Sequence, residues 1–326
     1  MTLDTLDREL LNLIQADFPL VERPFRVLGE KLGISEAEVI RRARGLKERG
    51  MVRLIGGVFN SASLGYQSTL VAMHLPDGRL DEAAAAVSRS TAVSHNYARE
   101  HHYNLWFTLT LPEGESLEQT ISGLARDAGA EDFISLPSEK LFKIDVFFDM
   151  VGKSDRPAAS KRTAAISNGS LSDEDRTVIK GLQQDLPLVG EPFAQIAENL
   201  GMRQGDFLSG AGSLLERGIM RRYGASLKHR EAGFAANAMS CWKVPPDQAE
   251  RVGAVMASYK TVSHCYQRRT NGDRWPYSIF GMIHSHTRAG CEEVARDIAE
   301  KTGIADYLLL YSTREFKKQR VRYFSD

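Results

Sequence analysis

The sequence predicts an α+β fold, a tandem repeat in which each copy is a winged helix-turn-helix followed by a ferredoxin-like βαββαβ domain. The first observation is a repeat, because residues 7–50 return in recognisable form at 175–218. The second is a strand motif, SHNYAR at 94–99, which returns as SHCYQR at 263–268. A chain that repeats a whole unit must be analysed as two copies before a fold is assigned to it.

Composition places the chain among ordinary soluble globular proteins. Its 326 residues suffice for two well-cored domains or four small ones, and 42% are apolar and 26% charged. Lys and Arg together number 42, as do Asp and Glu, so the formal net charge is zero. Because a general DNA binder draws much of its affinity from a basic surface, this balance argues against such a function.

The N-terminus and the cysteines predict a cytoplasmic protein. The first four residues, MTLD, are acidic and lead directly into a helical pattern, which is unlike a signal peptide. No apolar run approaches the ~20 residues that a membrane helix requires. The cysteines, Cys241, Cys265 and Cys291, are odd in number and form no Cys-x-x-Cys pair, which argues against a disulfide framework or a zinc ribbon.

The front of each copy is predicted to be a winged helix-turn-helix. In the first copy, an apolar stripe over residues 6–14 predicts one helix and Pro24 opens the next. Ser35 is placed to cap a third helix, which runs to about Arg49, and residues 51–55 begin a short wing strand. The predicted boundaries are 1–60 in the first copy and 171–228 in the second.

The back of each copy is predicted to be a ferredoxin-like domain. In the first copy we expect strands at about 67–75, 92–99, 103–111 and 132–149, with helices at about 80–89 and 116–128. The second copy repeats this order at 235–244, 247–258, 261–268, 277–285, 288–301 and 305–323. The predicted domains are 64–150 and 233–326, and the polar stretch 151–170 is a linker.

The predicted recognition helices are poorly suited to reading DNA. The first begins with Glu36 and Glu38, which place carboxylates where phosphates and base edges should be met. The second contains Gly205, Gly210 and Gly212, and each interior glycine costs about 1 kcal/mol of helix stability relative to alanine. We therefore expect the helix-turn-helix domains to act as a scaffold, with DNA binding absent.

The repeated strand motif predicts a site between the two copies. Side chains on a strand alternate between faces, so one face should carry Val93, His95, Tyr97 and Arg99, and in the second copy Val262, His264, Tyr266 and Arg268. The helices of a ferredoxin-like domain cover one face of its sheet, which leaves the other face free to meet the second copy. The two sheets would then bracket a slot lined by histidine, tyrosine and arginine.

Neighbouring strands add aromatic and basic residues to this slot. The additions are His101, His102, Tyr103 and Trp106 from the first copy, and Trp275, Tyr277, His284 and His286 from the second. Arginine and protonated histidine bind carboxylates, and aromatic rings supply a flat apolar wall, so the lining suits a large, flat, polyanionic ligand. Structural roles are the alternative, with Trp106 in the core and His101-His102 at a hairpin end. The histidines lack the short spacing of a metal site.

Several of these motifs together resemble the siroheme decarboxylases, a branch of the Lrp/AsnC-like architecture. They are FPLVERPF at 18–25, SHNY at 94–97 with YNLWFT at 103–108, and SHCY at 263–266 with WPY at 275–277. The resemblance covers nearly all of both copies, and the first copy looks like one subunit type of that family and the second like the other. The second copy departs from it in its glycine-rich third helix and its altered LPLVGEPF element at 186–193.

The resemblance implies removal of two acetate carboxylates from siroheme, giving 12,18-didecarboxysiroheme for heme d1 or for heme by an alternative route. No cofactor is implied, because the macrocycle accepts the electrons. His95 and His264 would be the acid/base pair or would orient the acetates. The other expected site residues are Tyr97 and Tyr266 as hydrogen-bond donors, Arg99 and Arg268 as carboxylate clamps, Tyr103, Trp106, Trp275 and Tyr277 as substrate-binding wall, and His101 or His102 at the iron or a propionate.

Two other functions fit the same lining. One is an Lrp/AsnC-type transcription factor that responds to a ligand, and the other is a non-catalytic heme or siroheme binding protein. The expected partners are siroheme, a second fused chain in a homodimer, and accessory decarboxylase subunits.

Overall fold

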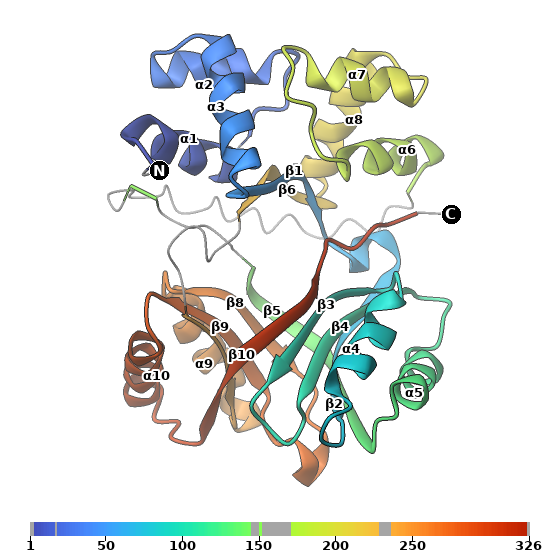
Figure 1. Ribbon diagram of the computed structural model, residues 1–326, viewed down its shortest axis with the longest axis vertical. Coiled ribbons are helices and arrows are strands. Elements are labelled where there is room, and N and C mark those ends of the chain that lie inside the picture. Colours follow the sequence, from blue (N-terminus) through green and yellow to red (C-terminus); the bar gives the residue numbers. More distant parts are fainter. Residues whose placement is uncertain (1–2, 17, 145–149, 152–170, 228–235, 325–326) are drawn as a thin grey trace. The chain divides into compact units, whose positions relative to one another are not determined.

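A computed structural model describes residues 3–16, 18–144, 150–151, 171–227 and 236–324, which fall into two compact units (Figure 1). The first unit joins Met1–Leu64, Phe147–Gly233 and Arg322–Asp326, and the second joins Gly65–Val146 with Phe234–Val321. Each unit therefore takes one part from each copy of the repeat: the helix-turn-helix domains form one unit and the sheet domains form the other. The predicted linker, apart from Val151, lies outside the described residues.

The helix-turn-helix unit has the elements that the sequence predicts. The first copy contributes α1 (Thr5–Ala16), α2 (Pro24–Leu32), α3 (Glu36–Glu48), β1 (Val52–Phe59) and η1 (Ala62–Leu64), and the second contributes α6 (Asp173–Leu182), α7 (Pro192–Asn199), α8 (Gln204–Glu216) and β6 (Met220–Leu227). Pro24 and Pro192 each start a helix, where the missing N–H costs no hydrogen bond. The Ser35 side chain accepts a hydrogen bond from the Glu38 amide, as expected of an N-cap.

The two wing strands pair with each other. β1 and β6 form a two-stranded antiparallel sheet in which Gly56 lies opposite Gly224. A Cβ on Gly224 would lie 2.8 Å from the Ile14 carbonyl oxygen, and one on Gly56 would lie 3.0 Å from that of Gln184. Because these glycines have no side chain, the chain at the ends of α1 and α6 can lie close to the sheet formed by β1 and β6. The observed wing strand β1 is longer than the short strand that the sequence predicted, because its partner strand comes from the other copy.

Replacing Gly224 with alanine is expected to destabilise the helix-turn-helix unit by about 1–3 kcal/mol, because the new methyl group would collide with backbone that cannot rotate away. The measurement is the urea midpoint followed by circular dichroism. Gly212→Ala in α8 is the matched control, since a Cβ there meets nothing within 4 Å, and it should stabilise by about 0.5–1 kcal/mol. Equal midpoints for both variants would contradict the close approach.

The sheet unit consists of two βαββαβ copies. The first contains β2 (Tyr66–His74), α4 (Leu80–Arg89), β3 (Val93–Arg99), β4 (Leu105–Pro112), α5 (Leu117–Ala128) and β5 (Asp132–Ile144). The second contains β7 (Ala236–Trp242), η2 (Pro246–Gln248), α9 (Ala249–Ser258), β8 (Val262–Arg268), η3 (Gly272–Arg274), β9 (Ile279–Ser285), α10 (Arg288–Thr302) and β10 (Tyr307–Lys318). The strands close into a barrel in the order β10-β3-β4-β2-β5-β8-β9-β7.

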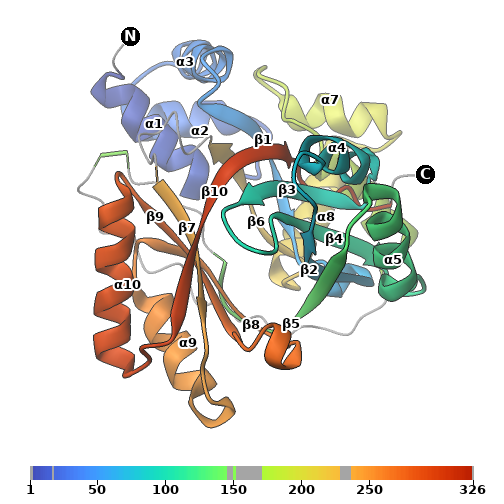
Figure 2. The ribbon, with the colours of Figure 1, turned by 60° about the horizontal axis from the view of Figure 1, so that its bottom comes forward.

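The copies close the barrel by exchanging the ends of their longest strands. β5 pairs with β2 through Pro137 and then with β8, and β10 pairs with β7 through Tyr311 and then with β3 (Figure 2). Phe142 and Phe316, on the exchanged ends, pack against the helix-side core of the opposite copy. The sequence predicted two facing sheets, whereas the structure joins them edge to edge, because β5 and β10 are long enough to serve both copies.

The sheet unit has three apolar clusters. One lies between each copy's helices and its strands, and the third contains strand and loop residues from both copies but no helix residue. This third cluster therefore fills part of the interior of the barrel. An eight-stranded barrel has an interior just wide enough for side chains or one small ligand. None of the helices in the described part of the chain has the length and apolar character needed to cross a membrane.

Candidate functional site

A β-bulge aims the predicted histidines into the barrel. In β3, Val93 lies opposite Leu109 and His95 lies opposite Thr108, so Ser94 is an extra residue, and Ser263 occupies the same place in β8. Because of this extra residue, Val93 joins the helix-side core and His95 faces the interior. The prediction that Val93 and Val262 share a face with the histidines was wrong, since strict alternation fails at a bulge.

After the bulge, the two motifs present parallel columns of side chains. His95, Tyr97 and Arg99 face inward on β3, as do His264, Tyr266 and Arg268 on β8, because they alternate with residues that face the helix-side cores. Three strands separate β3 from β8 in either direction around the barrel. The columns therefore stand on opposite walls of one barrel.

Each column is held together by ring contacts. The His95 and Tyr97 ring centroids are 6.3 Å apart, and the Arg99 guanidinium lies 5.8 Å from the Tyr97 ring. In the second copy, the corresponding distances are 6.2 Å between the rings of His264 and Tyr266 and 5.0 Å from the Arg268 guanidinium to Tyr266. A small group placed beside either tyrosine would thus be close to both a histidine and an arginine.

The two column arginines have no carboxylate partner among the described residues; Arg99 is buried and Arg268 is half-buried. Arg99 is 6% exposed and donates from Nη1 to the Leu310 carbonyl at 2.6 Å, and Arg268 donates to the Leu136 carbonyl at 2.9 Å. The Nε atoms of both arginines are buried and have no hydrogen-bond partner. Burial lowers the pKa of Arg99 to about 10 and also lowers the pKa of Arg268. Because arginine stays protonated in proteins, the barrel wall carries two cations with no counter-charge among the described residues.

The predicted aromatic wall forms a packed cluster at the hairpin end of the barrel. Trp106 and Trp275 are each 1% exposed, and their rings lie 5.1 Å apart. Trp106 donates from Nε1 to the Tyr103 carbonyl at 2.7 Å, the Tyr103 hydroxyl donates to Asp132 at 2.8 Å, and Tyr277 contacts Trp275. These residues come together, as predicted, but they contact one another and leave little surface for a ligand.

His101 and His102 lie beside this cluster. The Nδ1 atom of His101 accepts a hydrogen bond from the Tyr103 amide at 3.0 Å, so the neutral ring carries its proton on Nε2. Burial, and next the nearby His102, lower the pKa of His101. His102 is exposed and its ring stacks on that of His74, a residue that the sequence did not single out. In the part of the chain that the structure describes, no three His, Cys, Asp or Glu residues are grouped as in a metal site.

A hydrogen-bond network joins His264 to residues whose role sequence reasoning missed. The Ser263 hydroxyl lies 2.8 Å from Nδ1 of His264 and 2.6 Å from Nε2 of His284. The other ring nitrogen of His284 is hydrogen-bonded to Asn237. The repeated serine before each histidine was the available signal, but strand pairing was needed to bring His284 beside it.

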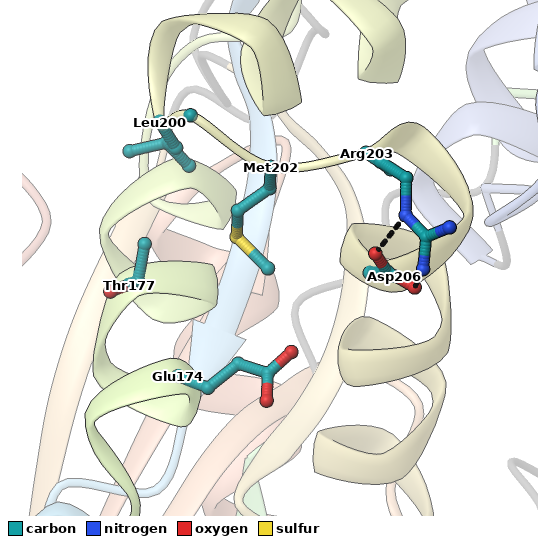
Figure 3. Close-up of a pocket in the computed structure, with 7 residues that line it drawn as sticks. Glu174, Thr177, Leu200, Met202, Arg203 and Asp206 are labelled. Carbon is teal, nitrogen blue, oxygen red and sulfur yellow. Dashed lines mark hydrogen bonds and ion pairs between the residues drawn. The ribbon is translucent and has the colours of Figure 1, made fainter.

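Charges on the recognition helices are largely paired within the protein. Arg41 and Arg42 both donate to Glu38, which lowers the pKa of that carboxyl to about 2, and Arg42 also pairs with Asp7. In the second copy Arg203 pairs with Asp206. An open hollow of about 470 Å³ lies beside that pair and is lined by Glu174, Thr177, Leu200, Gly201, Met202, Arg203 and Asp206 (Figure 3).

Comparison with known proteins agrees with this architecture. The AsnC-like ligand binding domain matches residues 63–143 and 231–317, and the siroheme decarboxylase NirDL-like HTH domain matches residues 7–53 and 175–221. Two helix-turn-helix domains with two such ligand domains, closed into one barrel, define a fused protein of the AsnC-like class.

Full-length relatives then identify the family. A siroheme decarboxylase of Hydrogenobacter thermophilus is 39% identical over 98% of this chain and 95% of its own, and a siroheme decarboxylase NirDL subunit of Paracoccus pantotrophus is 35% identical over 98% and 97%. The crystal structure of the siroheme decarboxylase NirDL with an iron-uroporphyrin III analogue superposes with a TM-score of 0.74 and 35% identity, covering 99% of this chain and 95% of that one. The chain belongs to the siroheme decarboxylase family.

Proposed function

We propose that this chain removes two acetate carboxylates from siroheme to give 12,18-didecarboxysiroheme. The observation that carries the proposal is the pair Arg99, which is buried, and Arg268, which is half-buried. They stand on opposite walls of the barrel and have no acidic partner among the described residues. The Nε atom of each is buried, and a buried charge without a partner is costly, so a site that keeps two such groups is suited to an anionic ligand. Support also comes from the relatives named siroheme decarboxylase and from the NirDL complex with an iron-uroporphyrin III analogue.

The geometry of each column suits one acetate. A carboxylate held by Arg99 and a methylene carbon near His95 would lie along the Tyr97 ring, since both groups approach that ring within about 6 Å. The second column offers the same arrangement to another acetate. The histidines and tyrosines of the columns are half-buried, so they are within reach of a ligand.

The chemistry requires a place for electrons and a source of a proton. When the bond between the methylene carbon and the carboxylate breaks, carbon dioxide leaves and its electron pair is delocalised into the tetrapyrrole. A proton must then reach the methylene carbon to give a methyl group. We assign this transfer to His95 in one column and His264 in the other, because imidazole exchanges protons near neutral pH. The tyrosines would hydrogen-bond the reacting groups.

The hairpin histidines divide between the two remaining roles. An imidazole that binds iron through Nε2 must carry its remaining proton on Nδ1, but Nδ1 of His101 accepts a hydrogen bond from the Tyr103 amide. His101 is therefore suited to donate to a propionate, and His102 is the candidate iron ligand of the pair. Trp106 and Trp275 would act as support for this end of the barrel.

The test is anaerobic incubation of the full chain with siroheme, followed by mass spectrometry of the tetrapyrrole. Loss of two molecules of carbon dioxide is the expected result. An unchanged mass with a shifted absorption spectrum would instead identify a binding protein. Salt-dependent binding of DNA by the protein, without decarboxylation of siroheme, would favour a transcription factor.

A further inference from the structure

The two histidines of the columns have different surroundings. Ser263, 5% exposed, lies between His264 and His284, at 2.8 Å from one ring and 2.6 Å from the other. His284 lies on β9, directly across from Asn237 on β7, with which it forms a hydrogen bond. Four polar side chains on three adjacent strands, β7, β9 and β8, thus form one continuous chain of hydrogen bonds.

The direction of these hydrogen bonds follows from the chemistry of the groups. The amide oxygen of Asn237 can only accept, so Nδ1 of His284 must carry a proton, and Nε2 is the nitrogen that gains or loses one. The Ser263 hydroxyl can donate and accept at once. It can therefore take a proton from Nε2 of His284 while it gives its own proton to Nδ1 of His264.

The first copy has hydroxyl groups at the corresponding positions. Two residues beyond the strand partner of the column histidine, β4 carries Thr110 where β9 carries His284. Across from Thr110 is Ser68, and their hydroxyl oxygens are 3.0 Å apart. Hydroxyl groups can conduct a proton but cannot store one near neutral pH, whereas imidazole can do both. The copies therefore differ at this position of the second strand, where the second copy has the imidazole of His284 and the first copy has the hydroxyl of Thr110.

We propose that His284 is a positioning residue that holds a proton for His264, so that the two columns are unequal in how they reprotonate their acetates. The inference rests on the proposed decarboxylation. As His264 gives its Nε2 proton to the methylene carbon, Ser263 protonates Nδ1 of His264 and is itself reprotonated by Nε2 of His284. The electron pair left by carbon dioxide forms the new C–H bond, and water later restores the proton on His284.

The test replaces His284 by the residue found in the first copy, as His284→Thr. Single-turnover reactions with siroheme are stopped at intervals. Mass spectrometry counts the molecules of carbon dioxide lost, and the two mono-decarboxylated isomers, which have the same mass, are separated by chromatography and assigned by nuclear magnetic resonance. We expect one loss of carbon dioxide to slow by on the order of 10- to 100-fold, less than the about 10²- to 10⁴-fold of a direct general acid–base group, because His284 acts through His264. The isomer that accumulates should be the one that His264→Ala accumulates, and added imidazole should restore the rate.

Two controls separate this role from a structural one. Arg296→Thr changes an exposed basic residue on α10 that lies outside the columns and should leave both steps unchanged. Ser263→Thr keeps the hydroxyl and should retain activity, whereas Ser263→Ala should behave as His284→Thr does. The affinity for siroheme, measured by absorption titration, should be the same in all these variants and the unmodified chain.

Three outcomes would overturn the inference: both steps at the unmodified rate in His284→Thr, both steps slowed equally, or a weakened affinity that accounts for the whole effect. If one of these outcomes is found but His264→Ala releases only one molecule of carbon dioxide, the role of His284 is wrong and the role of His264 stands. If His264→Ala removes both molecules of carbon dioxide at the normal rate, the assignment of His264 fails as well.

Discussion

His95→Ala and His264→Ala are each expected to stop the chemistry at a different mono-decarboxylated product. Each variant removes the proposed proton donor from one column and leaves the opposite column, separated from it by three strands in either direction, unchanged. General acid–base groups contribute about 10²- to 10⁴-fold, so the affected acetate should react that much more slowly while the other reacts normally. Mass spectrometry should find one carbon dioxide lost per siroheme in each variant, and chromatography with nuclear magnetic resonance should show that the two products have lost different acetates.

The controls for this experiment follow from the exposure of the side chains. Both histidines are half-buried in the barrel wall, so alanine should cost little stability and the unfolding midpoint should confirm that the variants remain folded. Arg296→Ala, at an exposed position on α10, should leave both steps intact. Accumulation of the same isomer by both variants would contradict the assignment of one column to each acetate, and full activity in both would exclude these histidines from the mechanism.

The fold was largely predictable because its signals are local or repeated. Apolar periodicity and caps such as Ser35 define the helices, and the repeat identifies the corresponding parts of each copy. The exchange of β5 and β10 was not predictable in this way. The exchanged end of β5 pairs with β8, which is far away in sequence, and Phe142 on this end packs against the core of the second copy. The length of a strand does not indicate which neighbouring strand it will pair with.

The site was predictable in its residue types but not in its geometry. The repeated histidine, tyrosine and arginine do face the barrel interior, but Val93 does not, because a β-bulge follows it. The bulge depends on how the strand pairs with its neighbour, and the sequence of the strand does not indicate it. The hairpin aromatics were assigned to a ligand wall on residue type, and Trp275 is instead buried among other rings. The contact of Ser263 with His284 joins residues on separate strands, so alternation within one strand could not indicate it.

Arg99→Met is expected to weaken siroheme binding while it preserves or raises stability. Loss of a charge-assisted hydrogen bond to a carboxylate costs about 1.5–3 kcal/mol, which corresponds to roughly 10- to 150-fold in Kd. Without ligand, however, the buried guanidinium has one hydrogen bond, to the Leu310 carbonyl, and no carboxylate partner among the described residues. Because a buried charge without a partner is costly, an apolar side chain of similar length should be tolerated in the ligand-free protein.

The alternative is that Arg99 and Arg268 only brace the barrel, since each donates to a carbonyl of the opposite copy. That role predicts a lower unfolding midpoint and an unchanged Kd, which is the reverse of the result expected for an anion clamp. Absorption titration and thermal unfolding of Arg99→Met, Arg268→Met and the double variant separate the two. Arg89→Met, at an exposed position on α4, controls for loss of net charge. If the arginines hold separate carboxylates of one ligand, their effects on the binding free energy should add.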